Sequence, residues 1–489
     1  MLVGGIDVGT QSVKVLIYDS SEKEIKALVS SPLELISHSD GTREQKAEWY
    51  IDAIKSCFDR VDGKLKREIK ALGVSGQQHG LVPISSDGEV LWNVKLWCDT
   101  STLDECKEIE EKAGGRENVI KMAGNPILPG YTASKILFLK NKHPEVYDKT
   151  AHMLLIHDYI NYFLTGKVIM ERGDASGTAL MDIRTGEWCE DLVSLISPTL
   201  LSKLPPILQS PSIIGEVKSD VSAMLGISEG TAVVSGGGDN MMSAIGTGAL
   251  RDGEITISLG TSGTLFASSS TPLIDEKCRL ASFSSSHSTY LPLLCTMNCT
   301  VAEEVLRKEM GVDVKEFVAL ASKAPLGSEG LVLLPFFNGE RIPDYPNGEA
   351  VLGGMNMTNV KKENIARSAL EGVSFEFLLG LEAFKELSFI PKRASLTGGG
   401  SKSEFWRQMI SDITGLEIRC PLVEEAAAFG AALEALAVAE GRSVVETAEE
   451  HLVFDEEKKA YPNMENHEKY KVCYEKWKKY SSVMAPIFS

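Results

Sequence analysis

Short apolar runs rich in β-branched residues alternate along this chain with longer segments whose apolar residues recur at helical spacing. Apolar or alternating runs predict strands at 1–19, 24–36, 69–75, 89–97, 231–235, 254–268, 331–335 and 393–397. Helical spacing predicts helices at 47–65, 135–141, 156–164, 362–387 and 426–440, helices that begin at Met241 and Glu404, and a last surface helix at 466–480. Residues 213–221 are predicted to connect elements at the surface. Because strands and helices alternate in both halves, we expect an α/β fold with mainly parallel sheets.

Two segments about half the chain apart, Gly5–Val15 and Ile255–Leu265, share one pattern: a β-branched strand, a Gly-Thr turn and a second strand. Such a pattern predicts a hairpin. Turns built from Gly, Thr and Ser expose backbone N–H groups and hydroxyls, which is the environment that a polyphosphate requires. A pair of ordinary hairpins is the alternative interpretation, but the matched spacing favours a nucleotide phosphate site.

The two hairpins differ at one informative position, where the first has Asp7 and the second has Ser258. A carboxylate beside phosphates is unfavourable unless a cation lies between them. We therefore expect the first hairpin to form the magnesium side of a nucleotide site and the second to bind phosphate alone. Two lobes that close on a nucleotide are the arrangement that this asymmetry predicts.

Length and composition favour a multidomain globular protein. The chain has 489 residues, of which 43% are hydrophobic, enough for more than one sizeable core. We place the division near 247–253 and expect domains at 1–248 and 249–489. The formal net charge of −18 argues against a surface that binds nucleic acid or an anionic membrane.

Cysteine usage and the N-terminal segment both indicate a reduced, cytoplasmic protein. The nine cysteines are odd in number, scattered and never spaced as CxxC, so we expect core thiols rather than disulfides or a zinc site. Met1–Gly4 leads directly into the first strand and leaves no room for a signal peptide. No uninterrupted run of about eighteen apolar residues predicts a membrane span.

The sharpest candidate for chemistry is Gly236–Asn240, where three glycines follow a predicted strand and Asp239 precedes a helix. Glycines let the backbone approach a ligand closely, and the N-terminus of a helix favours an anion. In one interpretation Asp239 is an ordinary helix N-cap. In the other, an acid near a phosphate site serves as general base for a hydroxyl nucleophile. Gly398–Ser401 is a second triple-glycine turn after a strand, and it lacks an acid.

Polar groups follow two strands of the first half, at Gly76–Gly80 and Trp97–Asp99. An amide, an imidazole, an indole and a carboxylate are groups that bind polyols, because they supply hydrogen bonds for hydroxyls and a flat face for C–H. A hydrogen-bonded structural histidine is the alternative interpretation of His79. The chain has no P-loop sequence, no HRD or DFG, and no G-x-G-x-x-G opening its first helix, which argues against P-loop enzymes, protein kinases and dinucleotide enzymes.

At these residues the chain resembles the FGGY carbohydrate kinases, and among them the xylulokinases, from Ile6 to about Ala437. The resemblance is carried by I-D-V-G-T at 6–10, G-Q-Q-H-G at 76–80, L-W-C-D at 96–99, P-G-Y-T-A-S-K at 129–135, G-G-G-D-N at 236–240, S-L-G-T-S-G at 258–263, N-G-E-R at 338–341, G-G-G-S-K-S-E-F-W-R-Q at 398–408 and A-A-A-F-G-A-A at 426–432. The segment 350–371 is similar to the second signature of the family.

This resemblance implies a two-lobed, actin-like (duplicated ribonuclease H-like) ATPase fold with ATP and sugar in the cleft between the lobes. It implies a kinase that uses ATP and Mg²⁺ to phosphorylate a primary hydroxyl of a ketopentose, first of all D-xylulose to D-xylulose 5-phosphate. A homodimer is a further expectation from the family. Asp239 is the implied catalytic base and Asp7 the implied magnesium ligand.

Together with the residue patterns above, the resemblance assigns the remaining contacts. The sugar is expected to contact Gln78, His79, Trp97, Asp99, Asp239 and Asn240. The nucleotide is expected to contact Thr10, Gln11, Ser12, Gly260, Thr261, Ser262, Gly398, Gly399 and Ser401. Acids therefore lie in the first half of the chain, and neutral glycine-rich turns lie in the second.

Three positions depart from the usual xylulokinase pattern: Gln78 stands in place of Met, Cys98 in place of Asn, and Phe138 in place of Trp. Because the first two bear on the choice of sugar, kinases for ribulose or gluconate are the nearest alternatives within the family. An actin-like ATPase of the chaperone or filament class is the alternative outside it. Such a protein needs both phosphate hairpins, but neither a base at Asp239 nor a sugar-binding His79.

Overall fold

The first half of the chain is built on a mixed sheet that contains the first predicted hairpin. In the computed structural model, which describes residues 1–488, three antiparallel strands are followed by two parallel ones. The strands are, in spatial order, β3 (Glu24–Pro32), β2 (Ser12–Asp19), β1 (Leu2–Val8), β6 (Ile69–Gly76), β15 (Ala232–Val234) and β14 (Ile213–Glu216), with β16 (Gly237–Gly238) also paired to β6. β14 closes the edge as an antiparallel strand.

The second half repeats this arrangement around the second predicted hairpin. Its sheet has the order β19 (Ala281–Ser284), β20 (Tyr290–Thr296), β18 (Gly263–Ala267), β17 (Glu254–Leu259), β23 (Arg393–Thr397) and β24 (Glu417–Arg419). β17 pairs antiparallel with β18 and parallel with β23, as β1 does with β2 and β6. Both hairpins and the α/β architecture predicted from the sequence are therefore confirmed. The expectation of mainly parallel sheets is wrong, because the hairpins and edge strands make antiparallel pairs the majority along each sheet.

Two helices, one from each half, pack closely against each other between the sheets. α11 (Asp239–Thr247) follows β15, and α16 (Ala426–Glu440) follows β24. An added Cβ at Gly430 would lie 1.9 Å from the Met242 carbonyl oxygen, and one at Gly5 of β1 would lie 1.8 Å from an α16 carbonyl oxygen. Only glycine permits such backbone approach, so Gly430 and Gly5 are points of close packing around α16.

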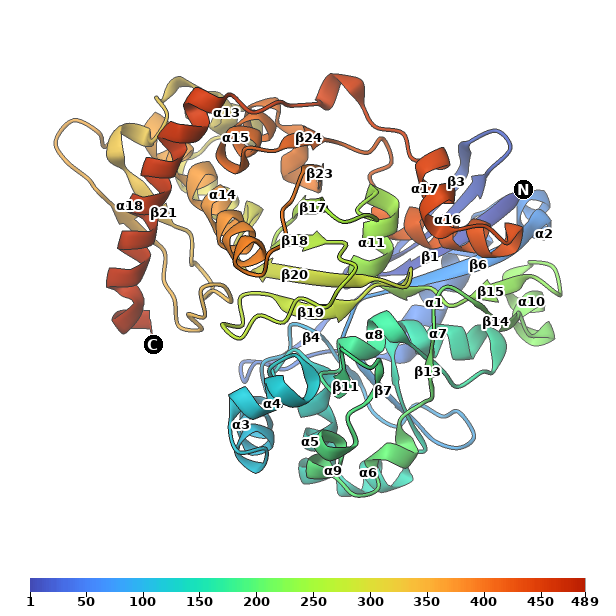
Figure 1. Cartoon of the computed structure of the whole chain (residues 1–489). Coiled ribbons are helices and arrows are strands. Elements are labelled where there is room, and N and C mark those ends of the chain that lie inside the picture. The colour runs from blue at the N-terminus through green and yellow to red at the C-terminus, as the bar shows by residue number, and fades with distance from the viewer. Residues whose placement is uncertain (489) are drawn as a thin grey trace.

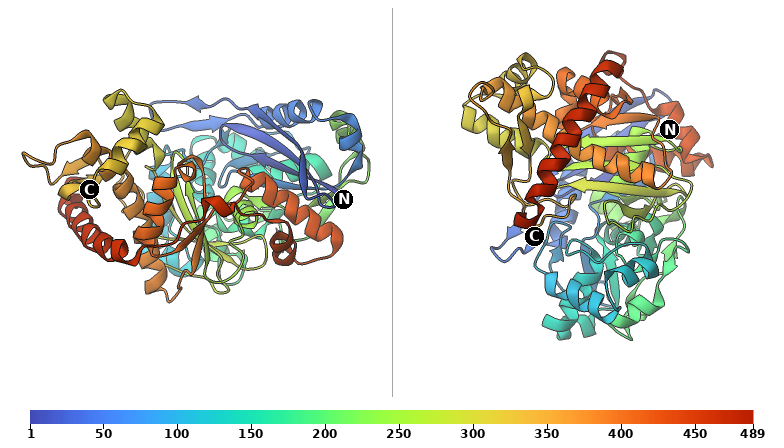
Figure 2. Two further views of the ribbon diagram at one scale, coloured as in Figure 1. Left: turned by 90° about the horizontal axis from the view of Figure 1, so that it is seen from above. Right: turned by 60° about the vertical axis from the view of Figure 1, so that its left-hand side comes forward.

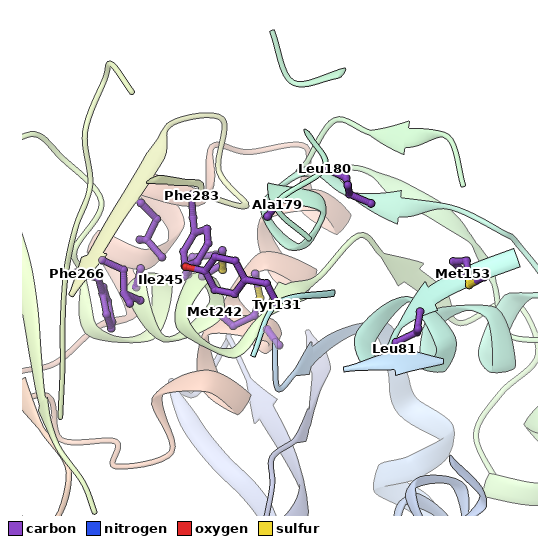
Figure 3. Close-up of a cluster of buried hydrophobic side chains, with 14 of the residues drawn as sticks. Leu81, Tyr131, Met153, Ala179, Leu180, Met242, Ile245, Phe266 and Phe283 are labelled. Atoms are coloured by element: carbon purple, nitrogen blue, oxygen red, sulfur yellow. The ribbon is translucent and has the colours of Figure 1, made fainter. Parts of the chain in front are cut away.

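One buried hydrophobic cluster spans both halves of the chain. It joins residues of the first sheet, of α11 and α16, and of the second sheet. Figure 3 shows Met242 and Ile245 of α11 between Phe266 of β18 and a pair of rings, Phe283 and Tyr131. Because α16 packs on the first sheet although it comes late in the chain, packing does not follow chain order. The proposed boundary between 248 and 249 stays a prediction.

Most of the remainder of the first half lies in the lower part of the molecule in Figure 1. Its elements are β4 (Ile36–Ser37), β5 (Arg43–Gln45), α1 (Ala47–Asp59), α2 (Gly63–Glu68), β7 (Leu81–Ile84), β8 (Val94–Lys95), α3 (Leu103–Lys112), α4 (Arg116–Ala123), α5 (Thr132–Lys142), α6 (Pro144–Lys149), β9 (His152–Leu155), α7 (Ile156–Thr165), β10 (Met170–Glu171), α8 (Arg172–Ser176), β11 (Met181–Asp182), β12 (Glu187–Trp188), α9 (Glu190–Ile196), β13 (Ile207–Leu208) and α10 (Ser219–Leu225). Helices α3 to α6 and α9 lie in this lower part, whereas α2 and α10 lie beside the first sheet on the right. Most of the elements lie between β6 and β15 in sequence, so the insertion begins where the predicted sugar-binding loop leaves β6.

The second half adds helices around its own sheet and a second core. They and two short strands are α12 (Thr300–Met310), α13 (Val314–Lys323), β21 (Val332–Leu334), β22 (Val351–Gly353), α14 (Lys362–Glu386), α15 (Glu404–Thr414), α17 (Val444–His451) and α18 (Met464–Phe488). Figure 2 shows α18 along the outside of the molecule, with the two chain termini at opposite ends. One face of α18 is nevertheless buried through Tyr470, Tyr474 and Trp477, so the prediction of a mere surface helix was incomplete.

Several predicted elements differ from the structure for identifiable reasons. The predicted helix 47–65 is two helices, because Asp62 accepts from the N–H groups of Lys64 and Leu65 and begins a new helix. The supposed connection 213–221 contains edge strand β14, whose pairing to β15 depends on tertiary contact. From the predicted pair of strands at 89–97, only β8 forms.

All nine cysteines are free thiols. In residues 1–488 no helix combines the length and the apolar character that crossing a bilayer requires.

Candidate active site

Asp7 is the second-to-last residue of the buried strand β1. Its carboxylate accepts a hydrogen bond of 2.8 Å from the Ser75 hydroxyl of the neighbouring strand. Burial raises its pKa, and the charge of Glu425 acts in the same direction, while Lys14 opposes it from a distance. Lys14 faces Asp7 in the hairpin register, so both side chains project from the same face of the sheet.

The turn between β1 and β2 is fastened to the sugar-side loops by Thr10. The Thr10 hydroxyl donates to Gln77 at 2.9 Å and accepts from the Trp97 indole N–H at 3.0 Å. Among the described residues, the backbone N–H groups of Thr10 and Gln11 have no acceptor. Ser12 begins β2, and its carbonyl accepts from the Gly9 N–H. The turn thus keeps free N–H donors, and their binding of a phosphate stays a prediction.

Asp239 is the first residue of α11, and the helix N-cap is Gly238. The interpretation of Asp239 as a cap is therefore wrong. The preceding glycines serve internal packing: a Cβ at Gly236 would lie 2.1 Å from the Val74 carbonyl oxygen, and one at Gly237 would lie 2.1 Å from Ser286. These contacts hold the start of α11 between β6 of the first sheet and the segment that follows β19 of the second, which sets the position of Asp239.

The environment of Asp239 suits a general base. Burial, followed by the negative charge of Asp7, raises its pKa to about 7, although hydrogen bonds from Asn240 pull in the other direction. Asn240 donates to the carboxylate through its backbone N–H at 2.8 Å and its amide at 3.0 Å. The side chain is only partly shielded from solvent. A partly accessible carboxylate with a pKa near neutrality exchanges protons readily at physiological pH.

Gln78 and Asn240 place two side-chain amides next to Asp239. The Asn240 amide donates to the Gln78 carbonyl oxygen at 3.0 Å. The Gln78 amide nitrogen is buried without a hydrogen-bond partner among the described residues. A buried donor of this kind costs free energy unless a ligand or water accepts from it. An amide donor without a hydrogen-bond partner therefore lies close to the candidate base.

His79 is held in an unusual backbone conformation with a neutral ring. Its φ is 68°, and its carbonyl oxygen accepts from Lys135 at 2.8 Å and from Thr132 at 3.2 Å. Its Nδ1 lies 2.7 Å from the Gly177 carbonyl oxygen, so this nitrogen donates and Nε2 keeps its lone pair. Burial lowers the His79 pKa to about 3, so the imidazole stays neutral. A neutral acceptor next to Tyr131 fits a hydroxylated ligand better than an anion.

Trp97 and Asp99 lie on the same loop but have different surroundings. The Trp97 ring is partly exposed, and its N–H is bonded to Thr10. The Asp99 carboxylate is fully buried and accepts from the Arg43 N–H, from Lys95 and from both donors of Ser101. Because all these contacts are internal, the structure gives Asp99 a part in holding the loop, and its contact with a sugar stays a prediction.

The predicted nucleotide turns of the second half lie together. Gly398 (φ 84°) packs its backbone on Leu259, the residue before the Gly260–Ser262 turn. No acceptor among the described residues takes the N–H groups of Thr261 and Ser262, and a Cβ on Gly399 would meet nothing within 4 Å. The Ser401 hydroxyl donates to the Gly398 carbonyl oxygen at 2.7 Å, which closes the triple-glycine turn. Two neutral turns thus border an open space.

Sequence reasoning missed three cationic residues around the site. Lys14 was overlooked, although hairpin register alone places it opposite Asp7. Lys135 is fully buried beneath His79, and desolvation lowers its pKa to about 7. Arg341 reaches the site from the second half, with its guanidinium carbon 5.9 Å from the Trp97 ring centroid. The motifs that contain Lys135 and Arg341 are visible in the sequence, but the sequence does not show where these two side chains point.

Comparison with known proteins agrees with this arrangement over almost the whole chain. Residues 2–246 match the N-terminal domain, and residues 255–439 the C-terminal domain, of the FGGY family of carbohydrate kinases. A xylulose kinase of Haemophilus influenzae is 39% identical over 483 residues, covering 97% of this chain and 98% of that protein. A xylulose kinase of Bacillus subtilis is 30% identical, covering 97% and 95%.

Solved structures give the same result for the fold. A ligand-bound xylulose kinase from Lactobacillus acidophilus has a TM-score of 0.92 and 26% identity, and the match covers 100% of both chains. This likeness and the repeated sheet order confirm the predicted two-lobed, actin-like fold.

Proposed function

Because this chain belongs to the FGGY family of carbohydrate kinases, we propose that it transfers the γ-phosphoryl group of ATP to a primary hydroxyl of D-xylulose, giving D-xylulose 5-phosphate. The position of Asp239 is the observation that best supports this function. Its partly accessible carboxylate, with a pKa raised to about 7, lies beside the unmet donor of Gln78 and at the start of the helix that joins the two halves. The xylulose kinases among its relatives support the choice of sugar.

In the proposed reaction Asp239 takes the proton of the sugar hydroxyl as that oxygen attacks the γ-phosphorus. Gln78, His79 and Asn240 hold the other oxygens of the sugar, and the Trp97 ring covers its C–H face. The neutral His79 accepts a hydrogen bond from a sugar hydroxyl through Nε2, while Asp239 takes the proton of the attacking hydroxyl. Fixed donors and acceptors of this kind supply orientation, which is a large part of catalysis in phosphoryl transfer.

The phosphate groups lie, in this proposal, between the turns of the two halves. The free N–H groups at Thr10 and Gln11 of the first half and at Thr261 and Ser262 of the second together stabilise charge on the transferring group. Ser12 and Gly260 complete the two turns, while Gly398, Gly399 and Ser401 border the rest of the nucleotide. Lys14 adds a positive charge on the side of Asp7.

The donors around Asp7 fit a divalent cation, which we propose to be Mg²⁺. Asp7 is a carboxylate that burial and the nearby charges of Glu425 and Asp239 disfavour, and its one close partner is the Ser75 hydroxyl. Carboxylate oxygen is the ligand that Mg²⁺ prefers, directly or through water. When bound, the ion would neutralise phosphate charge. Asp7 would hold it on the first-half side of the γ-phosphate.

Two further expectations accompany this function. A kinase of free sugars and ATP acts in the cytoplasm, and the family resemblance favours a homodimer. The net charge of −18 argues against nucleic acid as a partner. These statements stay predictions.

The test is coupled ADP release by the purified protein with Mg-ATP across D-xylulose, D-ribulose, L-ribulose, gluconate, glycerol and a blank without sugar. We expect the strongest response to D-xylulose. A stronger response to another sugar would retain the mechanism and assign specificity to Gln78 and Cys98. Equal turnover in every well, including the blank, would favour an actin-like ATPase and contradict the proposal.

A further inference from the structure

Among the described residues, Arg341 has no carboxylate partner, and its side-chain neighbours are the Cys295 thiol and the Trp97 ring. Other arginines of the second half, Arg279, Arg307 and Arg367, each pair with a carboxylate at 3.2 Å or less. Within residues 1–488, the guanidinium of Arg341 forms no ion pair, although it is only partly exposed to solvent. A half-buried guanidinium carries five N–H donors that require acceptors. Those acceptors are therefore to be sought in a ligand.

The guanidinium of Arg341 extends from the second half of the chain to residues of the first half. Arg341 follows β21 in the second half, yet its Nη2 would be 3.8 Å from a Cβ on Gly130, in the first half. Its carbon lies 5.9 Å from the Trp97 ring centroid, and its charge acts on His79. The Cys295 thiol is within hydrogen-bond reach. Arg341 thus brings a positive charge from the second half beside the predicted sugar-binding residues Trp97 and His79.

The backbone at Arg341 is fixed by the buried carboxylate of Glu340. This group accepts from the N–H groups of Met297 and Arg341, both at 2.7 Å, and from the Asn298 amide at 2.9 Å. A residue presented from such a network loses little entropy when it binds a ligand. Its position is therefore set before the sugar arrives.

The same segment also holds the nucleotide turn. The N–H of Cys299 donates to the Thr261 carbonyl oxygen, and that of Thr300 donates to the Gly260 carbonyl oxygen, both at 3.0 Å. Residues 297–300 are consequently bonded to Glu340 on one side and to the phosphate turn on the other. A movement of this turn onto ATP would carry Arg341 with it.

We propose that Arg341 is a sugar-binding residue supplied by the second half, an inference that rests on the proposed function. Its guanidinium donates hydrogen bonds to acceptor oxygens of the sugar on the side of Trp97. The sugar site is then complete only when both halves contribute. Because residues 297–300 join Arg341 to the Gly260–Thr261 turn, ATP in its own site favours the position in which Arg341 meets the sugar.

The test compares wild type with Arg341→Gln and Arg341→Lys. Because Arg341→Gln removes charge-assisted hydrogen bonds to the sugar, we expect the KM for D-xylulose to rise roughly tenfold or more. Arg341→Lys keeps the charge and should raise it less. The KM for ATP should stay within about twofold of wild type in both variants. The matched control is Arg172→Gln. Arg172 is also partly exposed and lies 5.8 Å from a ring, that of Tyr290, away from the proposed contacts, so its sugar KM should stay near wild type.

A second readout separates binding from a merely structural effect. Calorimetry would measure the Kd for D-xylulose with and without a non-hydrolysable ATP analogue. We expect the analogue to tighten sugar binding in wild type, and Arg341→Gln to lose most of this coupling while its melting temperature is kept. An active wild type together with an unchanged sugar KM and coupling in Arg341→Gln would overturn the inference. A wild type without any sugar-dependent turnover would instead contradict the proposed function.

Discussion

The two halves of the molecule have the same sheet and the same hairpin but different chemistry at equivalent places. Strand β1 carries Asp7 where β17 carries Ser258, and both strands pair in the same way with their neighbours. Helix α11 begins with Asp239, and its counterpart α16 begins with Ala426. Within one duplicated frame, the first half keeps the acids and the second half keeps neutral turns.

This difference shows how duplication separates two tasks. Each copy provides a turn with free N–H groups, which suits phosphate in either half. Burial raises the pKa of Asp239, and the negative charge of Asp7 raises it further, because like charges disfavour ionisation. A base with a raised pKa is useful where a proton must be taken, whereas the same acids beside the second turn would repel the nucleotide. The asymmetry therefore follows from the chemistry and not from the fold.

The largest expected effect comes from removing the acid of the first half. Asp239→Asn keeps the size of the side chain but cannot take a proton, and we expect kcat to fall by about 10²- to 10⁴-fold, the range for general base catalysis. Steady-state ADP release with D-xylulose measures it. Nucleotide affinity and melting temperature should stay close to wild type. Turnover near the wild-type rate would show that another group is the base.

Next in size is the effect of disturbing the contact between the two joining helices. Gly430→Ala forces a Cβ to within 1.9 Å of the Met242 carbonyl oxygen. We expect a loss of about 3 kcal/mol in the free energy of unfolding, the upper part of the range for overpacking. Denaturant unfolding measures it. Gly63→Ala, at an exposed helix start where the nearest atom is an arginine side chain at 3.5 Å, is the control and should be nearly neutral.

A smaller effect is expected when the second half is given the acid of the first. Ser258→Asp places a carboxylate beside the neutral phosphate turn, and repulsion of a few kcal/mol at short range is moderated by solvent and by the cation. We expect the KM for ATP to rise roughly tenfold, with less effect on the KM for sugar. Ser258→Asn has the same size without charge and should change the KM for ATP far less. Equal changes in both variants would contradict the electrostatic explanation.

The smallest predicted effect is a pH dependence that sharpens the role of Asp239. Its folded pKa is about 7, raised above the ordinary value, and the ionised form is the one that accepts a proton. Activity should therefore be fully present above pH 7 and fall about tenfold per pH unit below it. The pH profile of kcat/KM for the sugar measures this. A profile that is flat down to pH 5 would place the working pKa of the base near its ordinary value.

Much of the fold was predictable because its signals are local. The Gly-Thr hairpins, strand β23 and helix α16 follow from alternation, turn residues and helical spacing within a few residues of each other. Edge strand β14 and the buried face of α18 were missed, because both depend on partners far away in sequence. Local patterns do not record which face of an element meets the rest of the protein.

The candidate site was predictable to the same extent. Gln78, Asp239 and Asn240 come together as the motifs implied. Asp99 was predicted to bind the sugar because a carboxylate suits that role. In the structure its carboxylate instead forms a buried ion pair with Lys95, four residues earlier. Arg341 could not have been assigned to the sugar side, because only the tertiary structure brings it across to Trp97.

The most direct test of this account is proton-coupled ³¹P NMR of the reaction of the purified protein with Mg-ATP and D-xylulose. The account predicts one phosphomonoester signal, split into a triplet by a CH₂ group, that grows in step with ADP and is absent without sugar. Inorganic phosphate as the sole product, or a doublet from a secondary hydroxyl, would contradict it.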